Sequence, residues 1–123
     1  MMINELQKNV LKWAEDKGIL SKATLLTQIN KTQEELTETR DAIVRLDEID
    51  MDMFMTIIPE DAIPAVYRDS MLDEITDGIG DQLVTLIILA ELHGSNITEC
   101  LEYAYNEIKN RTGEMVNGTF VKD

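Results

Sequence analysis

Residues 72–92, LDEITDGIGDQLVTLIILAEL, decide the fold of this chain. Their apolar residues recur every three or four positions, which places the side chains on one face of an α-helix. That apolar face consists of Leu72, Ile75, Ile79, Leu83, Leu86 and Ala90. The pattern predicts a long helix from about Asp69 to His93. Three acids, Glu74, Asp77 and Asp81, lie opposite the apolar face.

Three other segments have the same helical spacing. The first spans residues 3–18 and contains the glycine that stops it. The second follows Ser21 and continues to about Glu48. The last begins at a capping sequence, Asn96 to Glu99, and ends near residues 111–113. We therefore expect an all-α fold, in which four principal helices form a helical-bundle protomer.

Between the second and third helices the pattern is irregular. We expect a Met-rich insertion around residues 49–68 with a short helix near Asp50 to Ile57, because Pro59 and Pro64 would each interrupt a continuous helix. From about residue 114 we expect an extended tail that is either exposed or in contact with a partner. A chain of 123 residues is long enough for one domain with a core and too short for two, so residues 1–123 are interpreted as a single all-α domain.

The composition argues against several classes of function. The chain has 24 acids against 11 bases and a net charge of −13, so the phosphates of a nucleic acid would repel it. One histidine and one cysteine do not suffice for a His/Cys zinc site within one chain. The longest apolar run, Leu83 to Ala90, is interrupted by Thr85 and is far shorter than the roughly 20 residues that span a membrane. No secretory signal is visible, so we expect a cytoplasmic protein.

Two acidic motifs stand out, Glu34-Glu35-Leu36-Thr37-Glu38 in the second helix and Glu74-Ile75-Thr76-Asp77, followed by Asp81, in the third. Residues three, four and seven positions apart share a helix face, so each motif forms an acidic surface. Two such surfaces would repel each other unless a divalent cation lay between them. Mg²⁺ takes oxygen ligands and keeps positions for water and substrate phosphates. The sequence therefore predicts a metal site built from two helices.

The order and spacing of these acids resemble the EExxE…ExxD signature of the MazG-like all-α nucleoside triphosphate pyrophosphohydrolases. Three further motifs are similar to a phage-type branch of that family. They are Gln28-x-x-Lys31, Asp77-Gly-Ile-Gly-Asp81 and Asn106-x-x-Lys109-Asn-Arg111-x-Gly113. The resemblance covers about residues 23–121. The interval between Glu38 and Glu74 is longer than is usual for the family.

The resemblance implies an enzyme that cleaves a ribo- or deoxyribonucleoside triphosphate between its α and β phosphates. The cofactor would be Mg²⁺, with Mn²⁺ as a substitute, and the products would be the monophosphate and pyrophosphate. Such an enzyme would serve nucleotide-pool control or housecleaning in the cytoplasm, which is the host's cytoplasm if the protein is viral. The resemblance also implies a homo-oligomer, either a dimer or a tetramer.

The resemblance assigns roles to individual residues. The metal ligands would be Glu35, Glu38, Glu74, Asp77 and Asp81, with Asp77 and Asp81 as rivals for the main aspartate. The catalytic group would be Glu34, Glu35 and Glu38, in which Glu34 is either a ligand or the base that activates water. The substrate-binding residues would be Gln28, Lys31, Asn106, Lys109 and Arg111. Lys31 has an alternative role as an ion-pair partner of Glu34 or Glu35. Lys109 and Arg111 have an alternative role, because basic side chains near the C-terminal end of a helix interact favourably with the helix dipole.

Two functions without enzymatic activity also fit the composition. The chain would then be a helical interaction module whose acids provide solubility, or an acidic DNA mimic that occupies a nucleic-acid-binding protein. A mimic should spread its acids along a surface at phosphate-like spacing. Here six acids are concentrated on two helix segments, which favours the metal site.

Overall fold

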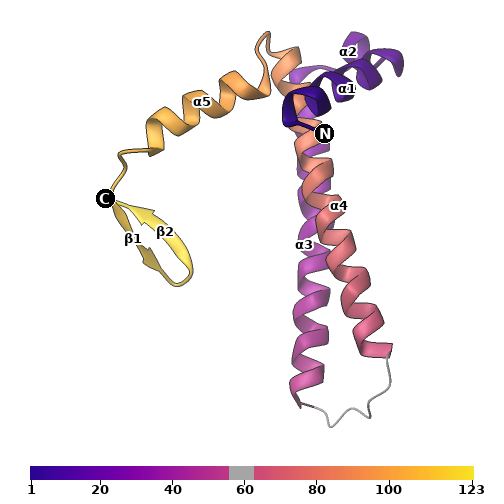
Figure 1. The fold of residues 1–123 in the computed structure, drawn as a ribbon, viewed down its shortest axis with the longest axis vertical. Coiled ribbons are helices and arrows are strands. Elements are labelled where there is room, and N and C mark those ends of the chain that lie inside the picture. Colours follow the sequence, from indigo (N-terminus) through magenta and orange to yellow (C-terminus); the bar gives the residue numbers. More distant parts are fainter. Residues whose placement is uncertain (56–62) are drawn as a thin grey trace.

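A computed structural model describes residues 1–55 and 63–123 of the chain. Helices form most of it, which confirms the expected all-α fold class (Figure 1). The elements are α1 (Ile3–Asp16), α2 (Ile19–Lys22), α3 (Leu25–Met55), α4 (Ile63–Leu92), α5 (Ile97–Ile108), β1 (Gly113–Val116) and β2 (Thr119–Lys122). Four of the helices are long, as expected, and α2 is a single turn.

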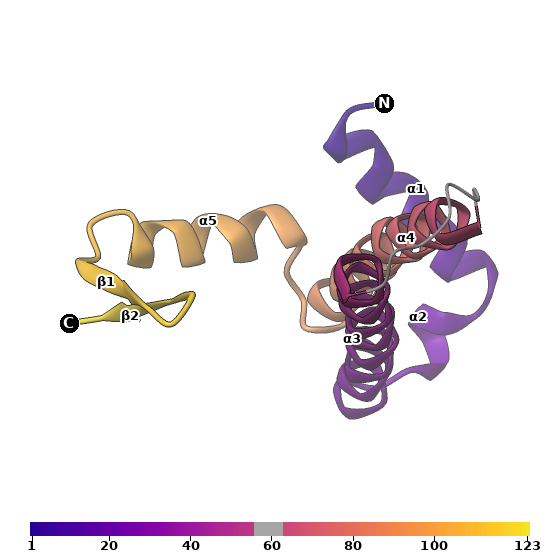
Figure 2. The same cartoon turned by 90° about the horizontal axis from the view of Figure 1, so that it is seen from below.

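The two longest helices, α3 and α4, lie antiparallel and form a long helical hairpin (Figure 1). Helices α1 and α2 lie at one end of this hairpin, where α1 packs on α4 and completely buries Ala14. From the same end α5 points away and carries the two strands to the C-terminus (Figure 2). The protomer is therefore a hairpin with one projecting arm.

The contact between α3 and α4 follows a heptad rhythm. The less exposed residues of α3 alternate at intervals of four and three: Gln28, Thr32, Glu35, Thr39, Ala42, Leu46 and Ile49. On α4 the matching positions are Met71, Ile75, Gly78, Gln82, Thr85, Leu89 and Leu92. We call these two rows the seam, which is the packing pattern of an antiparallel coiled coil.

The middle of the seam is polar. Gln28 Nε2 donates a hydrogen bond to the carbonyl oxygen of Thr85 at 3.1 Å, and the Thr32 hydroxyl donates to Thr85 Oγ1 at 2.9 Å. Further along, Gln82 Nε2 donates to Thr39 Oγ1 at 3.1 Å. Within residues 1–55 and 63–123 no buried side-chain nitrogen or oxygen lacks a partner, so these polar groups are accommodated without an unsatisfied donor.

Much of the apolar face expected on α4 lies beside the seam, although Ile75 belongs to the seam itself, and α3 has a similar apolar row beside the seam. The side chains of Leu36 and Ile79, for example, are 54% and 53% exposed. These rows occupy the positions that immediately follow seam residues, and they form an apolar flank of the hairpin. The members of this apolar flank are Ile29, Leu36, Ile43, Leu72, Ile79 and Leu86. A large part of the apolar surface that the sequence offers for packing is therefore not covered within one chain.

Three expectations for the irregular parts were wrong. No separate short helix begins near Asp50, because α3 runs unbroken to Met55. Residues 56–62 of the expected insertion, which include Pro59, lie outside the described residues. Pro64 does not break a helix, because it lies in the first turn of α4, where no backbone N–H is needed. The tail is exposed, as expected, but residues 113–122 form a β-hairpin.

No helix within the described residues is long and apolar enough to cross a membrane.

Candidate functional site

An acidic flank lies on the side of the hairpin opposite the apolar flank. Each of its residues comes immediately before a seam residue in the sequence. Glu38 precedes Thr39 on α3, Glu74 precedes Ile75 on α4, and Asp81 precedes Gln82 on α4. In an antiparallel pair of helices, positions with the same relation to the seam meet on the same side. This geometry explains why acids that are separated by more than thirty residues in the sequence face each other.

The acidic flank contains a cavity of about 290 Å³ at the middle of the hairpin. It is lined by Glu38, Thr39, Asp41, Arg45, Glu74, Asp77, Gly78 and Asp81. Four of the five expected metal ligands therefore lie around one cavity, and they come from both acidic motifs. Both rival aspartates, Asp77 and Asp81, belong to its lining.

The floor of the cavity is a close approach of the two helices. At Gly78 a Cβ atom would lie 3.1 Å from the Cβ of Thr39, and the hydroxyl of Thr39 would be closer still. Only glycine permits this approach without displacement of the threonine. The cost of glycine inside a helix, about 1 kcal/mol relative to alanine, therefore has a structural explanation at this position.

The fifth expected ligand, Glu35, lies on the seam next to the cavity. Its side chain is largely buried and forms an ion pair with Lys31 at 3.5 Å. The influence of Glu35 reaches Asp81, whose pKa is raised above its ordinary value. Burial is the main cause of that rise, followed by the negative charges of Asp77 and Glu35, while Lys31 acts in the opposite direction. The three carboxylates are thus close enough to repel one another.

Basic residues flank the acids. Lys31 Nζ lies 3.3 Å from Glu34 Oε2, and hydrogen bonding to Glu34 is the main cause of the raised pKa of Lys31. The alternative that Lys31 pairs with Glu34 and Glu35 is therefore what the structure shows. At the other end of the cavity Arg45 lies 3.8 Å from Glu74. The side chains of Lys31 and Arg45 are 50% and 54% exposed, so these ion pairs offset the negative charge of the acidic residues only weakly.

The structure places the expected substrate-binding residues in three different locations. Lys31 lies beside the acidic motif, as described above. Gln28 is buried in the seam, where its amide donates to the Thr85 carbonyl. Asn106, Lys109 and Arg111 lie on the projecting arm, which points away from the hairpin (Figure 1). Within one chain they are not brought to the cavity.

Sequence reasoning missed three residues that line the cavity, namely Thr39, Asp41 and Arg45. The signal that would have found them is the alternation of small and polar residues at Gln28, Thr32, Glu35 and Thr39, which has heptad spacing.

The cavity supplies hard oxygen donors, which suit Mg²⁺ or Mn²⁺. Burial and, after it, the charges of Asp77 and Glu35 disfavour the ionised form of Asp81, which raises its pKa. However, within residues 1–55 and 63–123 no three Asp, Glu, His or Cys side chains converge closely enough to hold an ion as they stand. The donor types therefore fit a divalent cation, and binding would require the acidic side chains to close on it.

Comparisons with models of protein families, with curated proteins and with solved structures found no significant match. The function is therefore inferred from the residues and the geometry of this chain.

Proposed function

We propose that this protein is a Mg²⁺-dependent nucleotide pyrophosphohydrolase that converts a (deoxy)nucleoside triphosphate to the monophosphate and pyrophosphate. One observation supports the proposal most strongly: Glu38 of the first motif lines a single cavity together with all three acids of the second motif, across the α3–α4 seam. The resemblance to MazG-like enzymes in the sequence provides the reaction type. We propose that the protein acts in the cytoplasm.

In this proposal Glu35, Glu38, Glu74, Asp77 and Asp81 hold the metal. A bound Mg²⁺ would offset the charge of the triphosphate, orient it and lower the pKa of an attacking water. Glu34 is more exposed than Glu35 and is positioned by Lys31, so it is available to accept the proton of that water. Lys31 lies at the edge of the cluster, where its ammonium group would contact a phosphate oxygen.

The two functions without enzymatic activity are less well supported by this arrangement. A DNA mimic needs acids spread over an outer surface, whereas five of the acids here line one cavity. An interaction module that uses acids only for solubility gives no reason to place Asp81 partly buried beside Asp77 and Glu35, an arrangement that raises its pKa. Carboxylates that repel one another around a cavity favour a ligand of positive charge.

We also propose that the protein is a homo-oligomer. The apolar flank of the hairpin has no partner within the described chain, and its side chains Leu36, Ile43 and Ile79 are each more than two-fifths exposed. Two hairpins that pack through these flanks would form a four-helix bundle with their acidic cavities on the outer sides. A dimer is the smallest assembly that covers this surface.

The test is release of pyrophosphate from a panel of ribo- and deoxyribonucleoside triphosphates, with Mg²⁺ and with EDTA. Asp77→Asn should reduce turnover by about 10²-fold or more, because a ligand is lost from the metal. Asp73→Asn is the matched control, since Asp73 lies one turn away on α4 outside the cavity. Glu38→Gln and Glu48→Gln form a second pair on α3. Release of no pyrophosphate from any nucleotide, or equal turnover within each pair, would contradict the proposal.

A further inference from the structure

Arg45 is the basic residue of the acidic cavity. Among the described residues that line the cavity, five are acids and only Arg45 carries a positive charge. Its Nη2 lies 3.8 Å from Glu74 Oε2, and its Nε donates a hydrogen bond to the carbonyl oxygen of Asp41 at 3.3 Å. Within residues 1–55 and 63–123 Arg45 pairs with no other carboxylate. One acid therefore holds its charge at the cavity, and that acid is an expected metal ligand.

The ion pair between Arg45 and Glu74 is loose. The two side chains are 54% and 48% exposed, and at 3.8 Å their charged atoms are farther apart than in a good hydrogen bond. Exposed pairs of this kind contribute little to stability. Lys31 is bound more firmly, because it contacts Glu34 at 3.3 Å and Glu35 at 3.5 Å. Arg45 can therefore change its partner more readily than Lys31 can.

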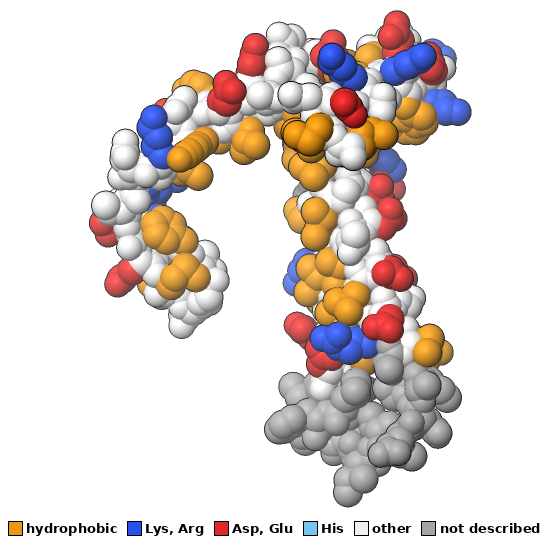
Figure 3. Space-filling model, in the orientation of Figure 1, with side chains coloured by type: hydrophobic (Ala, Val, Ile, Leu, Met, Phe, Trp, Pro, Cys, Tyr) orange, Lys and Arg blue, Asp and Glu red, His pale blue; other side chains and the backbone are white. Residues whose placement is uncertain are grey.

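Arg45 and Lys31 lie at opposite ends of the acidic flank. Each comes immediately before a seam residue of α3, so both are on the same side of the hairpin as the acids. The 14 positions between them in the sequence correspond to about 21 Å of helix. Figure 3 shows acidic side chains along the hairpin with fewer basic ones between them. An anion that enters the cavity therefore meets Arg45 at one end of the acids.

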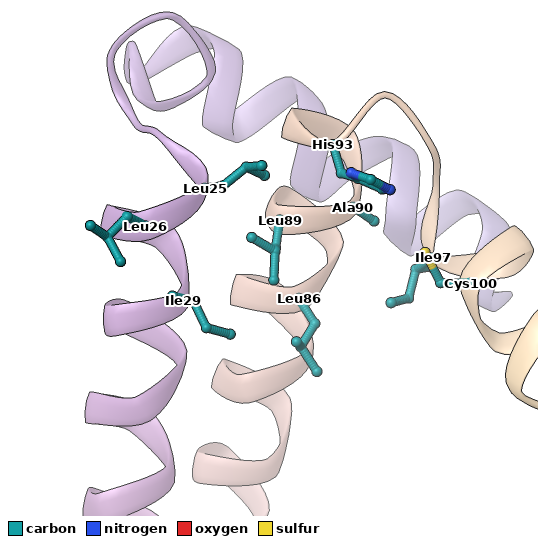
Figure 4. Close-up of a pocket in the computed structure, with 9 residues that line it drawn as sticks. All are labelled: Leu25, Leu26, Ile29, Leu86, Leu89, Ala90, His93, Ile97 and Cys100. Atoms are coloured by element: carbon teal, nitrogen blue, oxygen red, sulfur yellow. The ribbon is translucent and has the colours of Figure 1, made fainter.

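The two larger hollows of the described chain have a different chemistry. One, of about 590 Å³, lies between α3, α4 and α5, and its lining is aliphatic apart from His93 and Cys100 (Figure 4). The other, of about 400 Å³, lies between α1, α4 and α5 and includes Leu83, Leu101 and Tyr105. Neither lining contains a described lysine or arginine. Of these three hollows, only the acidic cavity offers an arginine to a phosphate.

We propose that Arg45 exchanges Glu74 for a phosphate of the substrate when a divalent cation binds Glu74. This inference rests on the proposed function, in which Glu74 is a metal ligand and the substrate is a nucleoside triphosphate. Before the metal binds, the guanidinium group of Arg45 partly compensates the charge of Glu74. Once Glu74 turns to the metal, Arg45 is free to donate to phosphate oxygens. Its planar group of N–H donors matches the geometry of a phosphate.

The exchange couples the binding of metal to the binding of phosphate. Arg45 competes with the cation for Glu74, so it weakens metal binding as long as no phosphate is present. A phosphate that binds Arg45 removes this competition, and the metal strengthens phosphate binding by the same factor. Lys109 and Arg111 lie on the arm away from the cavity (Figure 1). A residue of the cavity itself would thus perform the phosphate binding expected of them.

The competition is tested on the full chain by titration with Mn²⁺ alone, in which electron paramagnetic resonance measures the free ion. Arg45→Gln should lower the dissociation constant about two- to fivefold, as the loss of one exposed ion pair predicts. Arg45→Lys keeps the charge and should bind Mn²⁺ like the wild type. Arg40→Gln is the matched control, because it removes the same charge from an exposed arginine of α3 outside the cavity.

Three results of this titration would overturn the exchange. They are unchanged Mn²⁺ binding in Arg45→Gln, weaker binding in that variant, and an equal gain in Arg40→Gln, which would show a general effect of net charge. A wild type that binds no Mn²⁺ would refute the metal site itself, and this inference with it.

The phosphate contact is tested by equilibrium dialysis of inorganic pyrophosphate at saturating Mg²⁺, which requires no turnover. Arg45→Gln should weaken binding about ten- to a hundredfold, because hydrogen bonds between charged groups are lost. Arg45→Lys should recover only part of this loss, since an ammonium group lacks the planar donors. Equal affinity of Arg45→Gln and the wild type would overturn the phosphate contact. If these shifts occur but the wild type hydrolyses no nucleotide, the proposed reaction fails and the role of Arg45 in binding stands.

Discussion

Gly78→Ala and Gly80→Ala form a matched pair that tests how closely α3 and α4 approach beneath the acidic cavity. Both glycines lie in α4, two residues apart, and each substitution adds one methyl group. At position 78 the new Cβ would lie 3.1 Å and 3.3 Å from two carbon atoms of Thr39. At position 80 it would meet no atom within 4 Å. The same chemical change therefore meets a packed seam in one case and an open surface in the other.

The two variants should move the free energy of unfolding in opposite directions. Alanine is favoured over glycine in a helix by about 1 kcal/mol, so Gly80→Ala should stabilise the protein by about that amount. At Gly78 this gain is outweighed by overpacking, which costs about 1–3 kcal/mol. Displacement of Thr39 also weakens the hydrogen bond that it accepts from Gln82, at a cost of about 1 kcal/mol. The variants should thus differ by about 2–4 kcal/mol.

Urea unfolding followed by far-ultraviolet circular dichroism measures this difference. All samples should contain EDTA and the same protomer concentration, because metal binding and oligomerisation both shift apparent stability. We expect a lower midpoint for Gly78→Ala and a higher midpoint for Gly80→Ala, with similar slopes. Equal midpoints for the two variants would refute the close approach at Thr39. A loss of stability in both would refute the open surface at Gly80.

Two further predictions concern the site. Asp81→Asn should raise the free energy of unfolding at pH 7 in EDTA. Because the pKa of Asp81 is raised in the folded state, that state binds the proton more tightly than the unfolded state does. The stability of the wild type therefore falls as the pH rises from the ordinary pKa of 3.8 through the raised value, and the variant lacks this loss. Urea midpoints that do not differ between the variant and the wild type over that interval would contradict this. Gln28→Leu should cost about 1–2 kcal/mol, because it removes the donor to the Thr85 carbonyl. An unchanged urea midpoint with a raised KM would instead show that Gln28 acts on substrate.

Local signals in the sequence predicted most of the helices. Glycine at position 18, with a φ of 77°, ends the first helical region, and the Asn96 side chain accepts from the Glu99 amide at 2.9 Å, as its capping sequence predicts. The capping box is not fully formed, since the Glu99 carboxylate accepts from the hydroxyl of Ser95. Such features depend on a few neighbouring residues, so they can be read without knowledge of the rest of the fold.

The β-hairpin was predictable and was overlooked. Asn117 and Gly118 have φ angles of 50° and 82°, the left-handed conformation of a two-residue hairpin turn, and Asn-Gly is the strongest sequence signal for it. The flanking strands have only four residues each, so alternation alone does not reveal them. Pro64 illustrates the opposite error, since a proline signals a helix start as readily as a break.

The choice of packing face could not be made from one sequence. Hydrophobic periodicity identifies an apolar row on α3, but it does not say whether that row packs within the chain or against another chain. Here Gln28, Thr32 and Thr39 face α4, while Leu36 and Ile43 are exposed. The pairing of the acids on α3 and α4 followed from motif order, whereas the cavity floor at Gly78 and Thr39 followed only from the helix register.

The seam and the acidic flank together explain why this chain would depend on a second copy. Around the cavity the seam consists of Thr39, Gly78 and Gln82, so it contributes little of the apolar burial that stabilises helix pairs. Burial and, after it, the charges of Asp77 and Glu35 disfavour the ionised form of Asp81 and raise its pKa, which lowers the stability of the folded chain at neutral pH further. A cavity that binds a cation requires these same features. The apolar flank lies on the other side of the hairpin, where burial against a second chain can supply the missing stability without closing the cavity.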